Sequence, residues 1–81
     1  MRDLERYVLD NVPAARKMKS ISPDEDLLAR GTLDSLSLME MVSFIEQRYG
    51  IEVSDEDLVM ENFRSLGRIQ AFVDRKRGAT S

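Results

Sequence analysis

The segment from Ser35 to Tyr49 constrains the fold of this chain most, because its apolar residues repeat at the spacing of a helical turn. At about 100° of rotation per residue, five of them fall within one arc of roughly 100°. These residues are Leu38, Met41, Val42, Ile45 and Tyr49. Gly50 follows directly, and glycine often ends a helix in the left-handed conformation. The pattern predicts a helix from Ser35 or Leu36 to Tyr49, with this arc facing the core.

Shorter apolar patterns predict helices near both ends of the chain. The first opens near Arg2 and ends near Asn11, because Pro13 disfavours helical backbone at the residue before it. Its apolar residues are Leu4, Tyr7, Val8 and Val12. A further helical turn over residues 14–18 is compatible with the sequence. The last helix is expected between Ser65 as its cap and Gly78 as its stop, with basic residues near its C-terminal end. Its apolar residues are Leu66, Ile69, Phe72 and Val73.

Two further segments connect these helices. A long polar connection leads up to Asp34, and loops of this length are usually functional or disordered. Three leucines within it predict an ordered loop pinned to the core: Leu27, Leu28 and Leu33. Further on, Ser54 is followed by Asp57 at capping-box spacing, with acids in the first turn. We expect a short third helix from Asp55 to about Met60.

The expected fold is therefore all-α, a small four-helix bundle of three principal helices, one short third helix and one long loop between the first two principal helices. No strand pattern competes with it, and no internal repeat is visible. We expect residues 1–81 to form a single free-standing domain, with residues 1–2 and 78–81 flexible. Such a length is near the lower limit for folding without disulfides or metals.

The amino-acid composition excludes several classes of function. The 81 residues contain neither cysteine nor histidine, so disulfides, zinc sites and Ser-His-Asp or Cys-His catalysis are ruled out. No apolar run approaches the ~18 residues of a membrane span, and the N-terminal segment does not resemble a signal peptide. We expect a soluble cytoplasmic protein, a monomer by default, that does not act at membranes and is not itself an enzyme.

Charge is distributed unevenly along the chain. Residues 20–61 contain eleven acids and two bases, whereas the segments before and after them are net basic. Solvated surfaces and helix-end charges explain such a pattern. An acidic docking surface for basic partner enzymes is the alternative. The bases form no continuous basic helix interleaved with aromatic residues, so a nucleic-acid partner is disfavoured.

Ser35 stands where the long loop meets the second principal helix. A hydroxyl at such a position is commonly only a helix cap. No histidine or cysteine is available to activate it, so any chemistry at Ser35 must be carried out by a second protein. Leu36 and Met39 lie outside the core arc, on the side shared with Glu40 and Ser43. Single exposed apolar residues are normal on protein surfaces, so these two do not by themselves mark a binding site.

The run Asp34-Ser35-Leu36 at the start of this helix resembles the signature of acyl carrier and peptidyl carrier proteins. The similarity continues through Glu40, then residues 46–51 and 55–58, and covers roughly residues 27–73 in order and at the family's spacing. It implies that Ser35 receives 4′-phosphopantetheine from coenzyme A through a phosphopantetheinyl transferase. The thiol of this arm would carry an acyl or aminoacyl group as a thioester between partner enzymes. A helix N-terminus is favourable for the phosphodiester.

The resemblance also implies roles for neighbouring residues. Asp34 would help to position the transferase and its magnesium ion, although a carboxylate at this place also caps a helix. Leu36 and Met39 would form the apolar part of a partner-docking face with Glu40 and Ser43 beside them. The third helix, including Asp57, would lie beside the arm and contribute to partner selection.

Departures from the family pattern bear on the subtype. Ser37 stands where many fatty-acid carriers have an acid, Arg48 makes the second helix less acidic, and Gly31 stands alone where peptidyl carriers often have two glycines. The Gly-x-Leu-Asp-Ser run looks more like stand-alone carriers that a separate adenylating ligase loads, such as D-alanyl carriers and small carriers of natural-product pathways. Fatty-acid, polyketide and nonribosomal-peptide pathways all remain open, with further acyl-transfer or tailoring enzymes as downstream partners.

Three other functions can be considered for this sequence: a calcium loop, an unmodified docking module and phosphorylation of Ser35. A calcium loop starting at Asp24 fails because its fifth and sixth positions are Leu28 and Ala29 rather than an oxygen ligand and glycine. An unmodified helical module could dock a partner through Leu36 and Met39. Phosphorylation of Ser35 would also add charge at a helix N-terminus, without a supporting kinase-type pattern around it.

Overall fold

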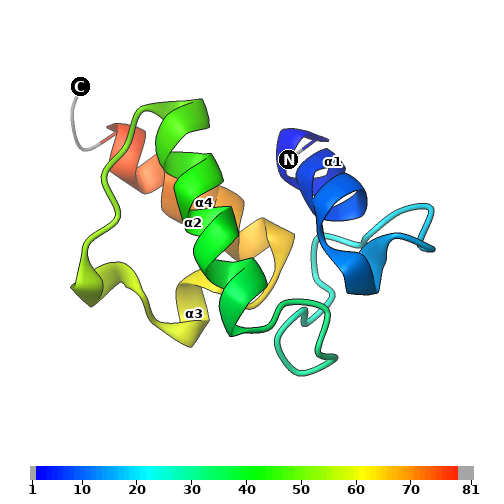
Figure 1. Cartoon of the computed structure of the whole chain (residues 1–81). Helices are drawn as coiled ribbons and strands as arrows, with labels where there is room; N and C mark the ends of the chain where they lie inside the picture. Colours follow the sequence, from blue (N-terminus) through cyan, green and yellow to red (C-terminus); the bar gives the residue numbers. More distant parts are fainter. Residues whose placement is uncertain (1, 79–81) are drawn as a thin grey trace.

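The computed structural model describes residues 2–78, and every regular element within them is helical. The α-helices are α1 (Arg2–Asn11), α2 (Ser35–Tyr49), α3 (Met60–Phe63) and α4 (Leu66–Gly78), with 3₁₀ turns η1 (Pro13–Ala15) and η2 (Asp55–Asp57). Figure 1 shows α2 in front of α4, α1 to one side, and the long connection at the end of the bundle where α2 begins. The expected four-helix bundle is confirmed. Of the ends expected to be flexible, Arg2 and Gly78 are helical, and Met1 and residues 79–81 lie outside the described part.

Helix α1 ends at Asn11, where the proline rule predicts. Leu4 and Val8 are fully buried, and Val12 is buried just beyond the helix. Val12 has extended backbone, as expected for a residue before proline, and η1 follows it as a short turn. The apolar stripe of α1 therefore faces the shared core.

Helix α2 matches its predicted bounds at both ends. Gly50 adopts the left-handed conformation with φ 67°, and its N–H donates to the Glu46 carbonyl at 3.0 Å. Most of the predicted arc is buried: Met41, Val42 and Ile45. The first and last residues of the arc in sequence, Leu38 and Tyr49, are half-buried and pack against this core. The sequence pattern gave no place to Phe44, which stacks on Tyr7 of α1 with ring centroids 4.3 Å apart.

The long connection is ordered, as its leucines predicted. Leu27 is fully buried and Leu33 almost so. Its backbone is held by hydrogen bonds to the α3–α4 junction: the Leu27 N–H donates to the Arg64 carbonyl at 2.7 Å, and the Gly67 N–H donates to the Pro23 carbonyl at 2.9 Å. These bonds fix the loop that leads into α2.

The predicted third helix from Asp55 to about Met60 is wrong in its bounds. Residues 55–57 form only the 3₁₀ turn η2, and α3 starts later, at Met60. Between them Leu58 has φ −82° and ψ 67°, and the Val59 N–H donates to the Asp57 carbonyl at 2.9 Å, which is an inverse γ-turn. The Asn62 side chain also donates to this carbonyl at 2.8 Å. The ψ of 67° at Leu58 lies outside the helical region, so the backbone leaves the helical path after η2 and the capping signal produces a single turn.

Helix α4 completes the core as predicted. The Arg68 N–H donates to the Ser65 hydroxyl at 3.2 Å, so Ser65 caps the helix. The four residues of the predicted apolar face are all buried: Leu66, Ile69, Phe72 and Val73. Phe72 packs against Phe63 of α3, with ring centroids 5.5 Å apart. Gly78 is the last helical residue rather than the residue after the helix.

Candidate functional site

The loop-to-helix junction at the start of α2 is built by Asp34. Its backbone is extended, its Oδ1 accepts a hydrogen bond from the Ser37 N–H at 2.8 Å, and its carbonyl accepts from the Leu38 N–H at 2.8 Å. Hydrogen bonds from the Ser37 backbone and side chain lower the pKa of the Asp34 carboxyl. Asp34 therefore caps α2 as an anion, and its part in positioning a transferase stays a prediction.

Ser35 is the first residue of α2, and its side chain is exposed. The N–H groups of Ser35, Leu36 and Ser37 lie in the first turn of α2, so they have no partner within the helix ladder, and Asp34 caps that of Ser37. An anion attached to the Ser35 hydroxyl would meet these donors and the positive end of the helix dipole. The junction thus presents a hydroxyl that another protein can reach.

Apolar side chains are exposed on both sides of this serine. Leu36 is 71% exposed and Met39 is 51% exposed, so neither belongs to the core, as their position off the arc predicted. Val59 is 48% exposed and Met60 is 62% exposed, and both lie where η2 gives way to α3. The sequence interpretation missed this second pair because it placed both residues inside a continuous helix. The two adjacent apolar residues after an acidic turn were the available signal.

A groove of about 480 Å³ runs from Ser35 towards α3, and we call it the α3-side groove. Its lining residues are Leu28, Gly31, Leu33, Asp34, Ser35, Leu38, Leu58, Val59, Met60 and Phe63. Asp34 is the only charged residue among them. The groove can therefore accommodate an extended, mostly uncharged group attached at Ser35.

The other residues predicted for the site differ in their surroundings. Glu40 and Ser43 are exposed on α2. Asp57 is half-buried, and one of its oxygens accepts from the Ser54 N–H at 3.1 Å and pairs with the Lys76 ammonium at 2.8 Å. These contacts lower the pKa of Asp57 to about 2, with the Lys76 hydrogen bond as the largest cause. Asp57 thus holds α4 against η2, and its contribution to partner docking stays a prediction.

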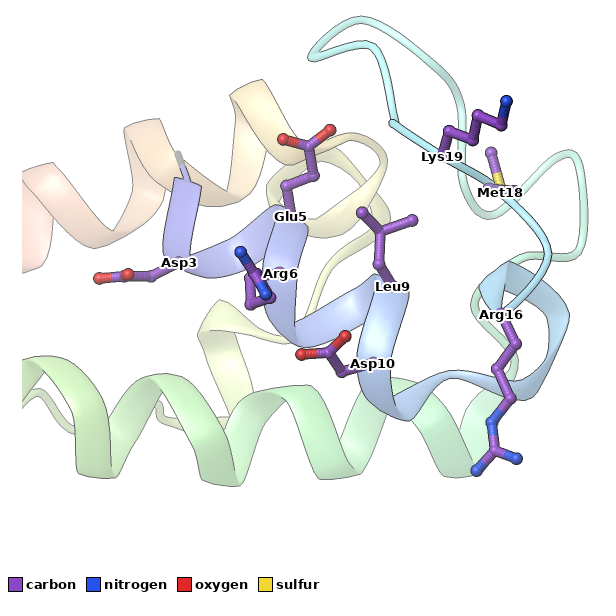
Figure 2. A pocket seen from close by; sticks show the side chains of 8 residues that line it. All are labelled: Asp3, Glu5, Arg6, Leu9, Asp10, Arg16, Met18 and Lys19. Atoms are coloured by element: carbon purple, nitrogen blue, oxygen red, sulfur yellow. The ribbon is translucent and has the colours of Figure 1, made fainter.

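A larger hollow lies elsewhere, between α1 and the first part of the long connection (Figure 2). It measures about 630 Å³, and it contains none of the predicted site residues. Figure 2 shows Arg16 and Lys19 directed apart rather than towards a common point. Glu5 in this hollow accepts the Ile21 N–H at 2.8 Å, and Asp3 pairs with Arg48 at 2.8 Å. Two of its acids therefore stabilise the fold, and the divergent bases form no common site.

Metal and membrane signals are both absent from residues 2–78. No group of three or more Asp, Glu, His or Cys side chains lies close enough together there to hold a metal ion. Likewise, none of the described helices has the length and apolar character that crossing a membrane requires.

Comparison with known proteins identifies the family. Residues 13–73 match the family described as "Phosphopantetheine attachment site". The chain is 38% identical over 53 residues to an acyl carrier protein homolog of Mycoplasmopsis pulmonis, covering 65% of this chain and 70% of the relative. It is 29% identical over 58 residues to the acyl carrier protein of Solidesulfovibrio magneticus, covering 72% of each chain.

A third relative matches this chain over less than half of its own length. The meromycolate extension acyl carrier protein of Mycobacterium tuberculosis is 31% identical over 55 residues, which cover 68% of this chain and 46% of the relative. The chain belongs to the phosphopantetheine attachment-site family of carrier proteins. Members of this family are carriers rather than catalysts, and their cofactor is 4′-phosphopantetheine, held covalently on a serine.

Proposed function

We propose that Ser35 is the residue that carries the 4′-phosphopantetheine arm, and that the chain moves an acyl or aminoacyl group between partner enzymes. The carrying observation is the junction itself, with an exposed serine at the first position of α2 beside an apolar groove. When bound, the cofactor supplies the thiol that a chain without cysteine lacks. Asp34 orders the helix start, and the positive end of the helix dipole there stabilises the phosphodiester.

The partners follow from this chemistry. A phosphopantetheinyl transferase must activate the Ser35 hydroxyl, because the chain has no histidine or cysteine to do so. The Gly-x-Leu-Asp-Ser run favours loading by a separate adenylating ligase, followed by acyl-transfer or tailoring enzymes. Leu36 and Met39 supply the apolar part of the docking surface, with Glu40 and Ser43 beside them. We place this work in the cytoplasm and the carrier in the monomeric state.

Mass spectrometry tests the attachment site directly. The purified chain, incubated with coenzyme A, Mg²⁺ and a broad-specificity phosphopantetheinyl transferase, is expected to gain one pantetheinyl group. Ser35→Ala should abolish the gain while helical circular dichroism is unchanged, whereas Ser20→Ala, which removes another exposed serine, should be modified normally. An unmodified parent chain, alongside a control carrier that is modified, would contradict the proposal.

The exposed Leu36 and Met39 also support a second candidate, an unmodified module that docks a partner helix through these side chains. That function needs no arm. It would be favoured if the parent chain stays unmodified in the same reaction and still binds a partner that Leu36→Asp fails to bind.

A further inference from the structure

The sulfur atoms of this chain differ in how far solvent reaches them. All of them belong to methionines, because the sequence contains no cysteine. Met39 and Met60 are exposed, whereas Met41 is fully buried and Met18 is half-buried. Among the methionines of residues 2–78, the two exposed thioethers are therefore the ones that a dissolved reagent reaches first.

Both exposed methionines lie next to the proposed attachment site, on different elements. Met39 follows Ser35 by four residues on α2, and residues at this spacing lie on the same side of a helix. Met60 is the first residue of α3 and lines the α3-side groove together with Ser35. A chemical change at either sulfur would thus alter the surface that a partner meets around the serine.

Hydrogen peroxide reacts with thioethers of this kind. The sulfur attacks one oxygen of the peroxide, and an S–O bond forms as the O–O bond breaks. The second oxygen takes up the proton of the first and leaves as water, so the sulfur is oxidised to a sulfoxide and the peroxide is reduced. The sulfoxide is polar and accepts hydrogen bonds, so its burial in an apolar contact costs free energy that burial of the thioether does not.

We infer that Met39 and Met60 are sites of reversible oxidation by hydrogen peroxide, and that oxidation there slows the reaction of the carrier with the phosphopantetheinyl transferase. This inference rests on the proposed function of Ser35. Before the arm is attached the chain has no thiol, so the exposed thioethers are the sulfur atoms that react first. Leu36, the other apolar residue of the docking surface, has no group that a peroxide oxidises. The response is therefore confined to the two methionines.

Peptide mapping of the peroxide-treated chain tests the sites. Tandem mass spectrometry distinguishes Met39 from Met41, and Met39 and Met60 should each gain an oxygen atom at least about tenfold faster than Met41, because exposure governs susceptibility. Comparable rates at Met39 and Met41 would overturn the assignment. Circular dichroism of the treated chain should match that of the untreated chain, because neither exposed side chain belongs to the core. A lost helical signal would also overturn the inference, since the slower reaction would then follow from unfolding.

The loading reaction with coenzyme A and Mg²⁺ tests the consequence. After the peroxide has been removed, the treated parent chain should be modified about tenfold more slowly than the untreated chain, because a sulfoxide must be desolvated at the contact. Incubation with methionine sulfoxide reductases for both epimers and a dithiol reductant should restore the rate. The double variant Met39→Leu with Met60→Leu keeps an apolar surface without the sulfur. It should be modified at one rate before and after treatment.

The outcomes separate the two proposals. If the untreated parent chain is not modified at all, the proposed function fails. If it is modified and the oxidised chain reacts at the same rate, oxidation does not control docking, while the role of Ser35 stands. The inference also fails, again without affecting Ser35, if treatment slows the double leucine variant as much as the parent or if the reductases do not restore the rate.

Discussion

Three consecutive residues at the start of α2 illustrate how the structure assigns roles residue by residue. Ser35 and Leu36 are exposed, whereas Ser37 is 6% exposed. Many fatty-acid carriers have an acid at the position of Ser37, where a charged carboxylate here would be desolvated. The small hydroxyl instead hydrogen-bonds the capping carboxylate of Asp34. Ser37 therefore belongs to the cap that orders the start of α2.

Leu36→Asp should separate docking from stability. Leu36 is 71% exposed, so an aspartate there should leave the free energy of unfolding within about 0.5 kcal/mol of the parent. The same change should slow modification by the transferase, because it removes apolar contact area beside Ser35. Urea unfolding and the initial rate of modification measure the two effects.

The matched variant is Met41→Ala, on the same helix but fully buried. It should lower the free energy of unfolding by about 2–5 kcal/mol, because it removes core contacts and leaves a cavity. A loss of that size for Leu36→Asp would show that Leu36 belongs to the core instead of the docking surface.

Asp57→Asn should change how stability depends on pH. The folded-state pKa of Asp57 is lowered from 3.8 to about 2, so its charged form stabilises the fold above about pH 4. That contribution is lost as the pH falls through the folded-state value. The parent should be more stable than the variant at neutral pH, and the difference should vanish towards pH 2. Thermal unfolding at several pH values measures it, and a difference that does not depend on pH would exclude the ionised carboxylate as its source.

At the scale of elements, the end of α2 follows from local backbone geometry. Gly50 occupies the left-handed region, with φ 67°, where a Cβ is unfavourable. Gly50→Ala should lower the free energy of unfolding by about 1 kcal/mol even though no atom lies within 4 Å of the added Cβ. Gly50→Asn should cost less, because asparagine tolerates this conformation. Equal stability of the alanine variant and the parent in urea unfolding would contradict this explanation.

Across the whole molecule, the long loop and α4 meet at a backbone contact with no room for a side chain. A Cβ added at Gly67 would lie 3.1 Å from the Pro23 carbonyl oxygen, to which the Gly67 N–H already donates at 2.9 Å. Alanine normally stabilises a helix interior by about 1 kcal/mol relative to glycine. Gly67→Ala should nevertheless destabilise the fold by about 1 kcal/mol, because the loop must shift away from α4.

Gly78→Ala is the matched control for this contact. An added Cβ at Gly78 meets no atom within 4 Å, so this variant should be neutral or slightly stabilising in the same thermal unfolding measurement. If both substitutions stabilise the protein, the loop at Pro23 moves away from α4 without loss of free energy. The contact between Pro23 and Gly67 then does not fix the position of this loop.

Local signals in the sequence were sufficient for most elements. Apolar periodicity, Pro13 and Gly50 determine the bounds of α1 and α2, because helix formation and termination depend mainly on nearby residues. The same periodicity leaves Leu36 and Met39 off the core arc, and the position of Ser35 at a helix start follows from the pattern. The family resemblance then supplied the chemistry that periodicity cannot.

The tertiary structure decided what depends on contacts between distant segments. The pairing of the Asp57 carboxylate with Lys76 of α4 joins two segments that no short window of sequence contains. The stacking of Phe44 on Tyr7 arises only where α1 meets α2, and the α3-side groove arises only where the long loop and α3 meet α2. Periodicity determines which face of a helix is buried, whereas the shape of a surface depends on packing between segments far apart in the chain.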